Sequence, residues 1–392
     1  MASYYFRNTG NTAWTTASNW SLTDGGGATG AVPLATDDAF FSNNSGNVVC
    51  SGAPVCKTLD FTKGTGFTGT ISLTNPLVVS GNVTLNAGMG TISGAGSLTL
   101  NASATLTSNG KVWGSNIVLA INLTTYTFAD NWTITGLTTL STSTINGNTL
   151  TMNGGLTTVG NPNGTTNFVF GGGTFSSTIS SNLGVQNNIT INSAGSVSIG
   201  TAVAPFVWSG GTFTYTAGTI TQAYLSLWGG SAMTFNTSGM TFNSIATSNN
   251  TIAQTFTLSS TLNATSLTLG FSAILSNNIV FAGSAGFNVG SLTIIFGNST
   301  KSLTLASGVT YNVNTSFTLT SGTSAIHQTI KSSTGGVKAI LTLKNGASQD
   351  LSFVNFTDID ASAGKTIGTY KGTIATSLNV KNLPVDIQAI TN

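Results

Sequence analysis

The sequence predicts an all-β chain, an elongated single-chain β-solenoid or parallel β-helix with an irregular N-terminal cap. Composition is the first indication: Gly contributes 48 of 392 residues, all acidic residues are Asp, and Thr, Ser, Asn and aliphatic residues dominate. Long helices draw on Glu, Lys, Ala and Leu, whereas β-branched and aromatic residues suit strands. The second is a short strand phrase that recurs along the chain. The third is a charged fraction of only 5%.

Residues 1–48 are expected to form the N-terminal cap or a particle-anchoring segment. They are irregular and rich in aromatic residues, and Trp14 and Trp20 are the candidates for cap packing or anchoring. Asp37 and Asp38 stand before the apolar sequence "AFF". Asp favours turns, so a turn is the preferred interpretation of this pair over a metal site.

Residues 49–345 are expected to form the solenoid shaft. Apolar residues alternate with Thr or Ser there, which is the period of two of a strand with one buried face. Gly or Asn then closes each unit, where the chain must turn. The phrase is written "GNVTLN" at 81–86, "GSLTLN" at 96–101, "SLTLG" at 266–270, "GSLTII" at 290–295 and "SFTLTSG" at 316–322.

An antiparallel β-sandwich array is the alternative fold. The spacing of the phrase is uneven, and "NG" pairs typical of hairpins occur, for example at 146–147 and 345–346. The solenoid is preferred because the pattern continues for nearly 300 residues without a domain break. The remaining segment, 346–392, is expected to hold the final coils and a C-terminal cap.

The distribution of charge also favours stacked coils. Residues 131–300 contain no charged side chain, and most charges lie in 1–63 and 301–392. Stacked coils place equivalent residues about 4.8 Å apart, so like charges would repel, whereas Thr, Ser and Asn can form hydrogen-bonded ladders. Open strand edges at the two ends would need caps.

Composition argues against several classes of protein. No apolar run approaches the roughly 20 residues of a spanning helix, so we expect no membrane insertion. The net charge of +2 without a basic cluster argues against nucleic-acid binding. The start, "MASYYFRNTG", lacks the basic and apolar regions of a secretory signal.

The two cysteines, Cys50 and Cys56, have no histidine nearby and are too few to ligate zinc. Either they form a disulfide across a short turn, or they are two buried thiols in the core. No metal and no cofactor is expected.

No catalytic residues are predicted. A glycan-cleaving enzyme needs two carboxyl groups, and the plausible pairs are Asp358 with Asp360 and Asp37 with Asp38. Both pairs suit solvated or turn-bonding Asp better. His327 is the single histidine and supports no Ser-His-Asp arrangement. Trp208 and Trp228 are the candidates for exposed rings that stack on a glycan, although core packing is the more common role of tryptophan.

The N-terminal sequence resembles a known module. "NTAWTTASNWSLTDGGGATGAVPLATDDAFF" (11–41) and the following "VCKTLDFTKGTGFTGTISL" (55–73) are similar to modules that open bacterial β-repeat surface proteins and β-solenoid phage virion proteins. "SFVNFTDIDASAGKTI" (352–367) looks like a late coil of β-helical phage tail and spike proteins. The resemblance implies an appendage or decoration on a particle or cell surface, often homotrimeric.

The functional hypothesis is therefore a non-enzymatic, surface-exposed virion protein: a tail fibre or spike, or a capsid decoration (head fibre). Its expected partners are two further copies, other capsid or tail proteins, and a host surface glycan. A bacterial cell-surface adhesin is the alternative. An ice-binding solenoid is disfavoured, because an ice-binding face needs Thr in regular ranks and the repeat spacing is irregular.

Overall fold

The protein is described by a computed structural model. The description covers residues 1–7, 10, 12–119, 124–141, 143–158, 163–164, 168–172, 175–179, 188–203, 205–208, 210–228, 232–248, 253–270, 278–296, 299–320 and 326–383.

The chain is a β-solenoid of about 11 turns, as predicted. Among the described strand pairs, only β1 (Ser3–Phe6) with β2 (Trp20–Ser21) is antiparallel. Other pairs join strands of successive coils in parallel, for example Leu98 with Leu77 and with Ile117. The antiparallel sandwich alternative is therefore wrong. Each coil is short: the Ser108 amide donates to Asp130, 22 residues ahead, and the Thr373 amide to Asn355, 18 residues back.

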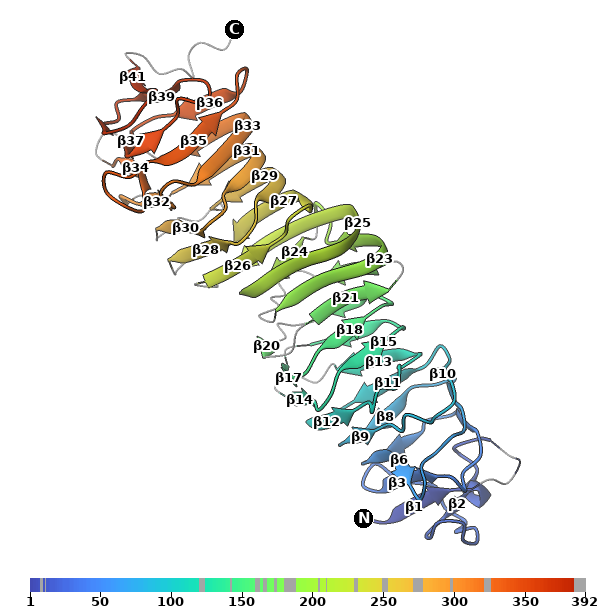
Figure 1. Cartoon of the computed structure of the whole chain (residues 1–392). Coiled ribbons are helices and arrows are strands. Elements are labelled where there is room, and N and C mark those ends of the chain that lie inside the picture. The colour runs from blue at the N-terminus through green and yellow to red at the C-terminus, as the bar shows by residue number, and fades with distance from the viewer. Residues whose placement is uncertain are drawn as a thin grey trace. The chain divides into compact units, whose positions relative to one another are not determined.

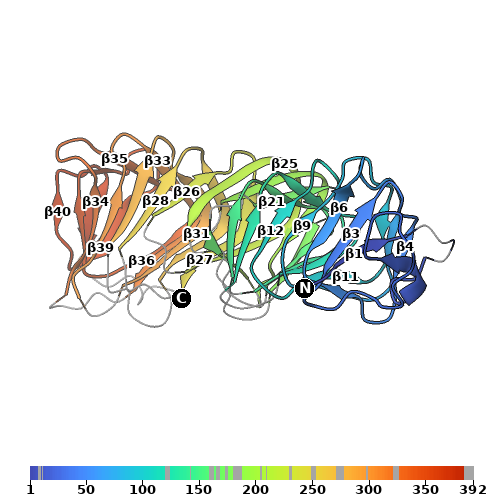
Figure 2. The same cartoon turned by 90° about the horizontal axis from the view of Figure 1, so that it is seen from below.

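Contacts divide the chain into two compact units, Met1–Val197 with Ala217–Thr219, and Ser198–Thr216 with Ile220–Asn392. The predicted division at 345/346 coincides with no change in topology, since the strands before and after it pair with the same neighbour. Both views show the strands of each unit as successive layers (Figures 1 and 2).

Coils of the first unit have three faces. One face holds β4 (Val48–Cys50), β7 (Ile71–Leu73), β10 (Ile92–Ser93), β15 (Trp132–Ile134), β18 (Leu150–Met152), β21 (Phe168–Gly172) and β23 (Ile189–Ile199). The next holds β5 (Val55–Cys56), β8 (Leu77–Val79), β11 (Ser97–Leu100), β13 (Asn116–Leu119), β16 (Thr138–Leu140), β19 (Leu156–Thr158) and β22 (Phe175–Ile179).

The third face of the first unit begins with β2, β1 and the short 3-10 helix η1 (Ala17–Asn19) beside them. It continues through β3 (Asp38–Ser42), β6 (Leu59–Lys63), β9 (Val83–Thr84), β12 (Ala104–Thr107), β14 (Thr125–Phe128), β17 (Thr144–Gly147) and β20 (Asn163–Gly164).

Coils of the second unit also have three faces. The first face holds β26 (Ala232–Asn236), β28 (Gln254–Leu258), β30 (Ile279–Gly283), β32 (Ser302–Leu305), β34 (Gln328–Ser332), β37 (Val354–Thr357) and β40 (Ile374–Ala375). The other two faces share β24 (Phe206–Trp208), β25 (Gly211–Trp228), β27 (Thr241–Ser248), β29 (Leu262–Leu269), β31 (Phe287–Ile295), β33 (Thr310–Thr320), β35 (Ala339–Leu343), β36 (Ser348–Leu351), β38 (Ile359–Asp360), β39 (Ile367–Tyr370) and β41 (Val380–Leu383).

Long strands of the second unit cross a corner between two faces. β33 shows this most clearly, because residues 310–313 pair with β35 and residues 316–319 pair with β36. The first halves of β29, β31 and β33 therefore lie on the second face with β35, and their second halves lie on the third face with β36. β25 begins one face earlier, since residues 211–214 pair with β26 on the first face.

Apolar side chains of the alternating strands fill the interior of each coil. In the second unit the Phe281 ring lies 5.2 Å from the Phe256 ring, 5.2 Å from the Phe287 ring and 6.1 Å from the Tyr311 ring. All four side chains are buried. Rings of three successive coils thus pack on one another here.

Residues 1–48 form an aromatic-rich end of the first unit, on which β3 pairs with β6 of the next coil. Trp14 and Trp20 are fully buried, with ring centroids 4.8 Å apart, and the Trp20 indole donates to the Trp14 carbonyl at 2.7 Å. The Asp37 carboxylate accepts the amides of Ala2 and Leu34 at 2.7 and 3.1 Å. Asp38 begins β3 opposite Ser3. The Trp14–Trp20 contact and the Asp37 hydrogen bonds therefore hold this end of the unit together, and Asp38 contributes through the pairing of β3 with β1. A cap or anchoring role of the four residues stays a prediction.

We expect Phe281→Ala to lower the free energy of unfolding of the second unit by about 3–5 kcal/mol, because it leaves a cavity among buried rings. Thr304→Ala, on the outer side of β32, is the matched control and should change it by less than about 0.5 kcal/mol. Denaturant unfolding of both variants measures the difference. Equal effects would mean that the ring stack does not hold the coils together.

Candidate functional site

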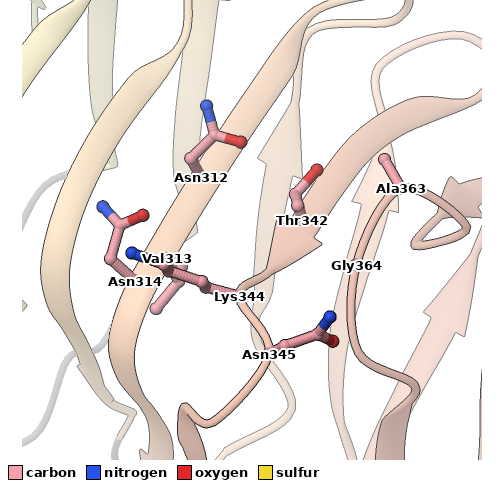
Figure 3. Close-up of a pocket in the computed structure, with 8 residues that line it drawn as sticks. All are labelled: Asn312, Val313, Asn314, Thr342, Lys344, Asn345, Ala363 and Gly364. Atoms are coloured by element: carbon pink, nitrogen blue, oxygen red, sulfur yellow. The ribbon is translucent and has the colours of Figure 1, made fainter.

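An open pocket of about 310 Å³, lined by both polar and apolar residues, lies at a corner of the second unit (Figure 3). It forms where β33 crosses from the second face to the third, and where β35 ends. The loop between β38 and β39 adds Ala363 and Gly364 as a further wall. The remaining lining residues are Asn312, Val313, Asn314, Thr342, Lys344 and Asn345. Segments of successive coils thus build one site.

Stacking positions the walls of this pocket. Val313 is buried and pairs with Leu343, which sets the two strands side by side. The Asn314 side-chain amide donates to the Asn288 side chain at 2.8 Å and to the Val289 carbonyl at 2.9 Å. Gly364 permits close approach, since a Cβ there would lie 2.4 Å from the Leu343 carbonyl oxygen.

The pocket presents amide, hydroxyl and ammonium groups. Its polar side chains come from β33 (Asn312), from β35 (Thr342) and from the turn after β35 (Lys344 and Asn345) (Figure 3). Within the described part of the chain these four side chains have no hydrogen-bond or ion-pair partner, and no carboxylate lines the pocket. The site therefore carries positive charge and free hydrogen-bonding groups.

Trp208 does not lie where the sequence placed it. Its side chain is fully buried, with ring centroids 5.7 Å from Phe213 and 5.4 Å from Phe235. The prediction of an exposed ring for glycan stacking is wrong for Trp208, because the residue packs in the coil interior. Trp228 ends β25, and its side chain lies outside the described part of the structure.

Cys50 and Cys56 are free and buried, so the disulfide is not formed in this structure. Cys50 ends β4 and pairs with Leu73, and Cys56 ends β5 and pairs with Val79, so the two thiols lie on adjacent faces of one coil. Burial raises the pKa of Cys50 to about 12. Burial, with smaller effects of Cys50 and Asp38, also raises the pKa of Cys56 well above its usual range.

The carboxylates of Asp358 and Asp360 bond to their own chain. Asp358 accepts hydrogen bonds from the Thr376 hydroxyl and from the Gly336 amide, and these lower its pKa. Asp360 accepts the Ser362 amide at 2.9 Å, and hydrogen bonds from Ser362 lower its pKa. Asp358 is 6% exposed and has a positive φ of 54°. This is the geometry of corner-forming residues.

The sequence reasoning missed an aromatic column on the outer surface of the last coils. Phe353 contacts His327 and Tyr370, with ring centroids 5.7 and 6.1 Å apart, and the Lys371 ammonium lies 5.0 Å from the Tyr370 ring centroid. His327 Nδ1 also lies 3.2 Å from Asn355 Oδ1. The signal in the sequence for this column was an aromatic residue or histidine that recurs once per coil, just before a strand or at its end.

The structure also bears on metal binding and on membrane insertion. Among the described residues, no group of three or more His, Cys or Asp side chains is arranged to hold a metal ion. No helix in that part of the chain is long and apolar enough to cross a membrane. Comparisons with protein-family models, with curated proteins and with solved structures found no match.

We expect both thiols to be unreactive in the folded protein. Their raised pKa values keep them protonated at about pH 8, near the ordinary pKa of cysteine, and burial excludes the reagent. The reagent DTNB should titrate two thiols only after unfolding in guanidinium chloride without reductant. A disulfide would leave none to titrate, and rapid reaction of the folded protein would contradict the burial of both residues.

We expect acid to destabilise the second unit through Asp358 and Asp360. Because their pKa values are lowered on folding, their contribution is present above the ordinary carboxyl pKa of about 4 and is lost as pH falls through the folded-state values. The melting temperature of the wild type should therefore fall below about pH 4, and that of Asp358→Asn should fall less steeply. Identical pH profiles would show that Asp358 makes no such contribution.

Proposed function

We propose that this chain is a non-enzymatic structural protein of a bacteriophage particle, a tail fibre or spike or a capsid decoration, used for host attachment or for reinforcing the shell. The sequence of residues 11–41 and 55–73 supports the proposal by its resemblance to modules of such proteins. The stacked-coil fold is compatible with an appendage that presents side chains to its surroundings.

The observation that best supports the proposal is the presence of in-register rows of uncharged side chains on the outer side of the coils. On the third face of the second unit, Ser266, Ser291 and Ser316 pair with one another across three strands. Thr268, Thr293 and Thr318 form a second row beside them. Such rows present hydroxyl groups at the inter-strand distance of about 4.8 Å and attract no counter-ions. A surface of this kind suits contact with neighbouring proteins and with sugar hydroxyl groups.

A non-enzymatic role is favoured by what the candidate carboxylates do. Both oxygens of Asp37 accept backbone amides, and both oxygens of Asp358 accept hydrogen bonds from neighbouring coils. Catalysis by a carboxyl pair needs one group free to donate a proton and the other free to attack or to activate water. These side chains are instead committed to the structure of the cap and of the last coils.

The proposal includes the partners expected of such a protein. They are two further copies in a homotrimer, other capsid or tail proteins, and a host surface glycan. Residues 1–48 would attach the chain to the particle, and the outer rows of the coils would face outward on the virion. No role is proposed in nucleic-acid binding or membrane insertion.

We expect an antibody to this chain to label purified phage particles in immunogold electron microscopy. Label at the tail would identify an attachment fibre or spike, and label on the head would identify a decoration protein. Pre-immune serum and particles of an unrelated phage are the controls. Label confined to the bacterial envelope would contradict the proposal and would indicate an adhesin.

A further inference from the structure

We propose that the pocket between β33, β35 and the loop of Ala363 and Gly364 binds a carboxylated sugar, a uronic acid unit of a surface polysaccharide. The inference rests on the proposed attachment function and names its ligand class. The observation behind it is the combination, in one pocket, of amide groups with a single ammonium group and no carboxylate.

The size of the pocket suits one or two sugar units. A volume of about 310 Å³ lies at the lower end of the range for small-molecule sites. The pocket is open to the surface, so a longer chain could continue beyond it. An internal unit of a polysaccharide could therefore occupy it.

Amide side chains match the hydroxyl groups of a sugar. Each Asn can donate from its nitrogen and accept at its oxygen, as each sugar hydroxyl also donates and accepts. Asn314 is held in one orientation, because its nitrogen already donates to Asn288 and Val289, which leaves its oxygen as an acceptor. Asn312 and Asn345 add two amides, and Thr342 adds a hydroxyl. Ordering of Asn314 before binding lowers the entropic cost of recognition.

Lys344 selects for a carboxylate. Among the described residues the single ion pair joins Lys63 to Asp60, so the Lys344 ammonium has no acidic partner there. A neutral sugar would leave this charge unmatched, whereas a carboxylate would form a charge-assisted hydrogen bond with it. A lone inorganic anion would use the ammonium and leave the amides unpaired. A uronic acid uses both.

The test is calorimetric titration of the full chain near neutral pH and at low salt. The probes are trigalacturonic acid and a hyaluronan tetrasaccharide, with the methyl ester of trigalacturonic acid as the uncharged match. We expect the wild type to bind at least one of the two acidic probes. If it binds trigalacturonic acid, the methyl ester should bind at least about ten-fold more weakly.

Variants locate the binding. Lys344→Gln should weaken binding of the acidic probe about ten-fold, and Asn345→Ala should weaken it a few-fold. Both residues are exposed, and the side chains have no described partners, so folding should be retained. Lys331→Gln removes an equal charge from the outer side of β34 and is the matched control. It should leave the affinity unchanged.

Three results would overturn the inference: no binding of either acidic probe by wild type, equal binding of trigalacturonic acid and its methyl ester, or equal losses in Lys344→Gln and Lys331→Gln. Particle labelling separates this failure from failure of the proposed function. Label on the virion without binding removes only the sugar site. Binding without label on the virion keeps the site and removes the virion role.

Discussion

Parallel, in-register stacking of coils is the constraint on which the rest of this structure depends. Each backbone strand pairs with the coil before and the coil after it, so a side chain at one position lies about 4.8 Å from its equivalents. Buried positions are mostly apolar, as Leu77, Leu98 and Ile117 are, although the same row continues to the buried Thr138. Outward positions must tolerate close neighbours, and Ser, Thr and Asn do so because each can hydrogen-bond along a row.

The same close stacking explains some of the glycine. At Gly94 a Cβ would lie 2.1 Å from the Leu73 carbonyl oxygen, and at Gly283 it would lie 2.3 Å from that of Leu258. Both residues also have positive φ, 110° and 99°. A corner that turns the chain out of one strand therefore excludes every side chain where it touches the coil before it. Coil geometry therefore requires glycine at these corners.

The fold and the buried residues could be predicted because the apolar positions of the recurring strand sequence are the ones that face the interior. The spacing of this strand sequence looked uneven because it occurs on more than one face of each coil: Leu292 lies on β31 and Leu303 on β32. On one face the spacing is regular, since Leu267, Leu292 and Phe317 pair at intervals of 25 residues. The burial of Trp208 was missed, although Phe206 and Trp208 stand two residues apart and share the buried face of β24; Val207 between them is buried as well and breaks the alternation. The pocket was also missed, because stacking alone brings Asn312, Lys344 and Gly364 together.

Stacking also explains how a coil can carry charge at all. Lys331 lies between Thr304 and Thr357, and Asp350 lies beside Thr318, so each charged residue has neutral neighbours in its row. A charge placed between uncharged residues meets no like charge in its row. Lys344 is in the same situation at the corner of β35, surrounded by amides. Among the described residues Lys344 has no acidic partner, so the scarcity of charge in the coils leaves its ammonium available to a ligand in the amide-lined pocket.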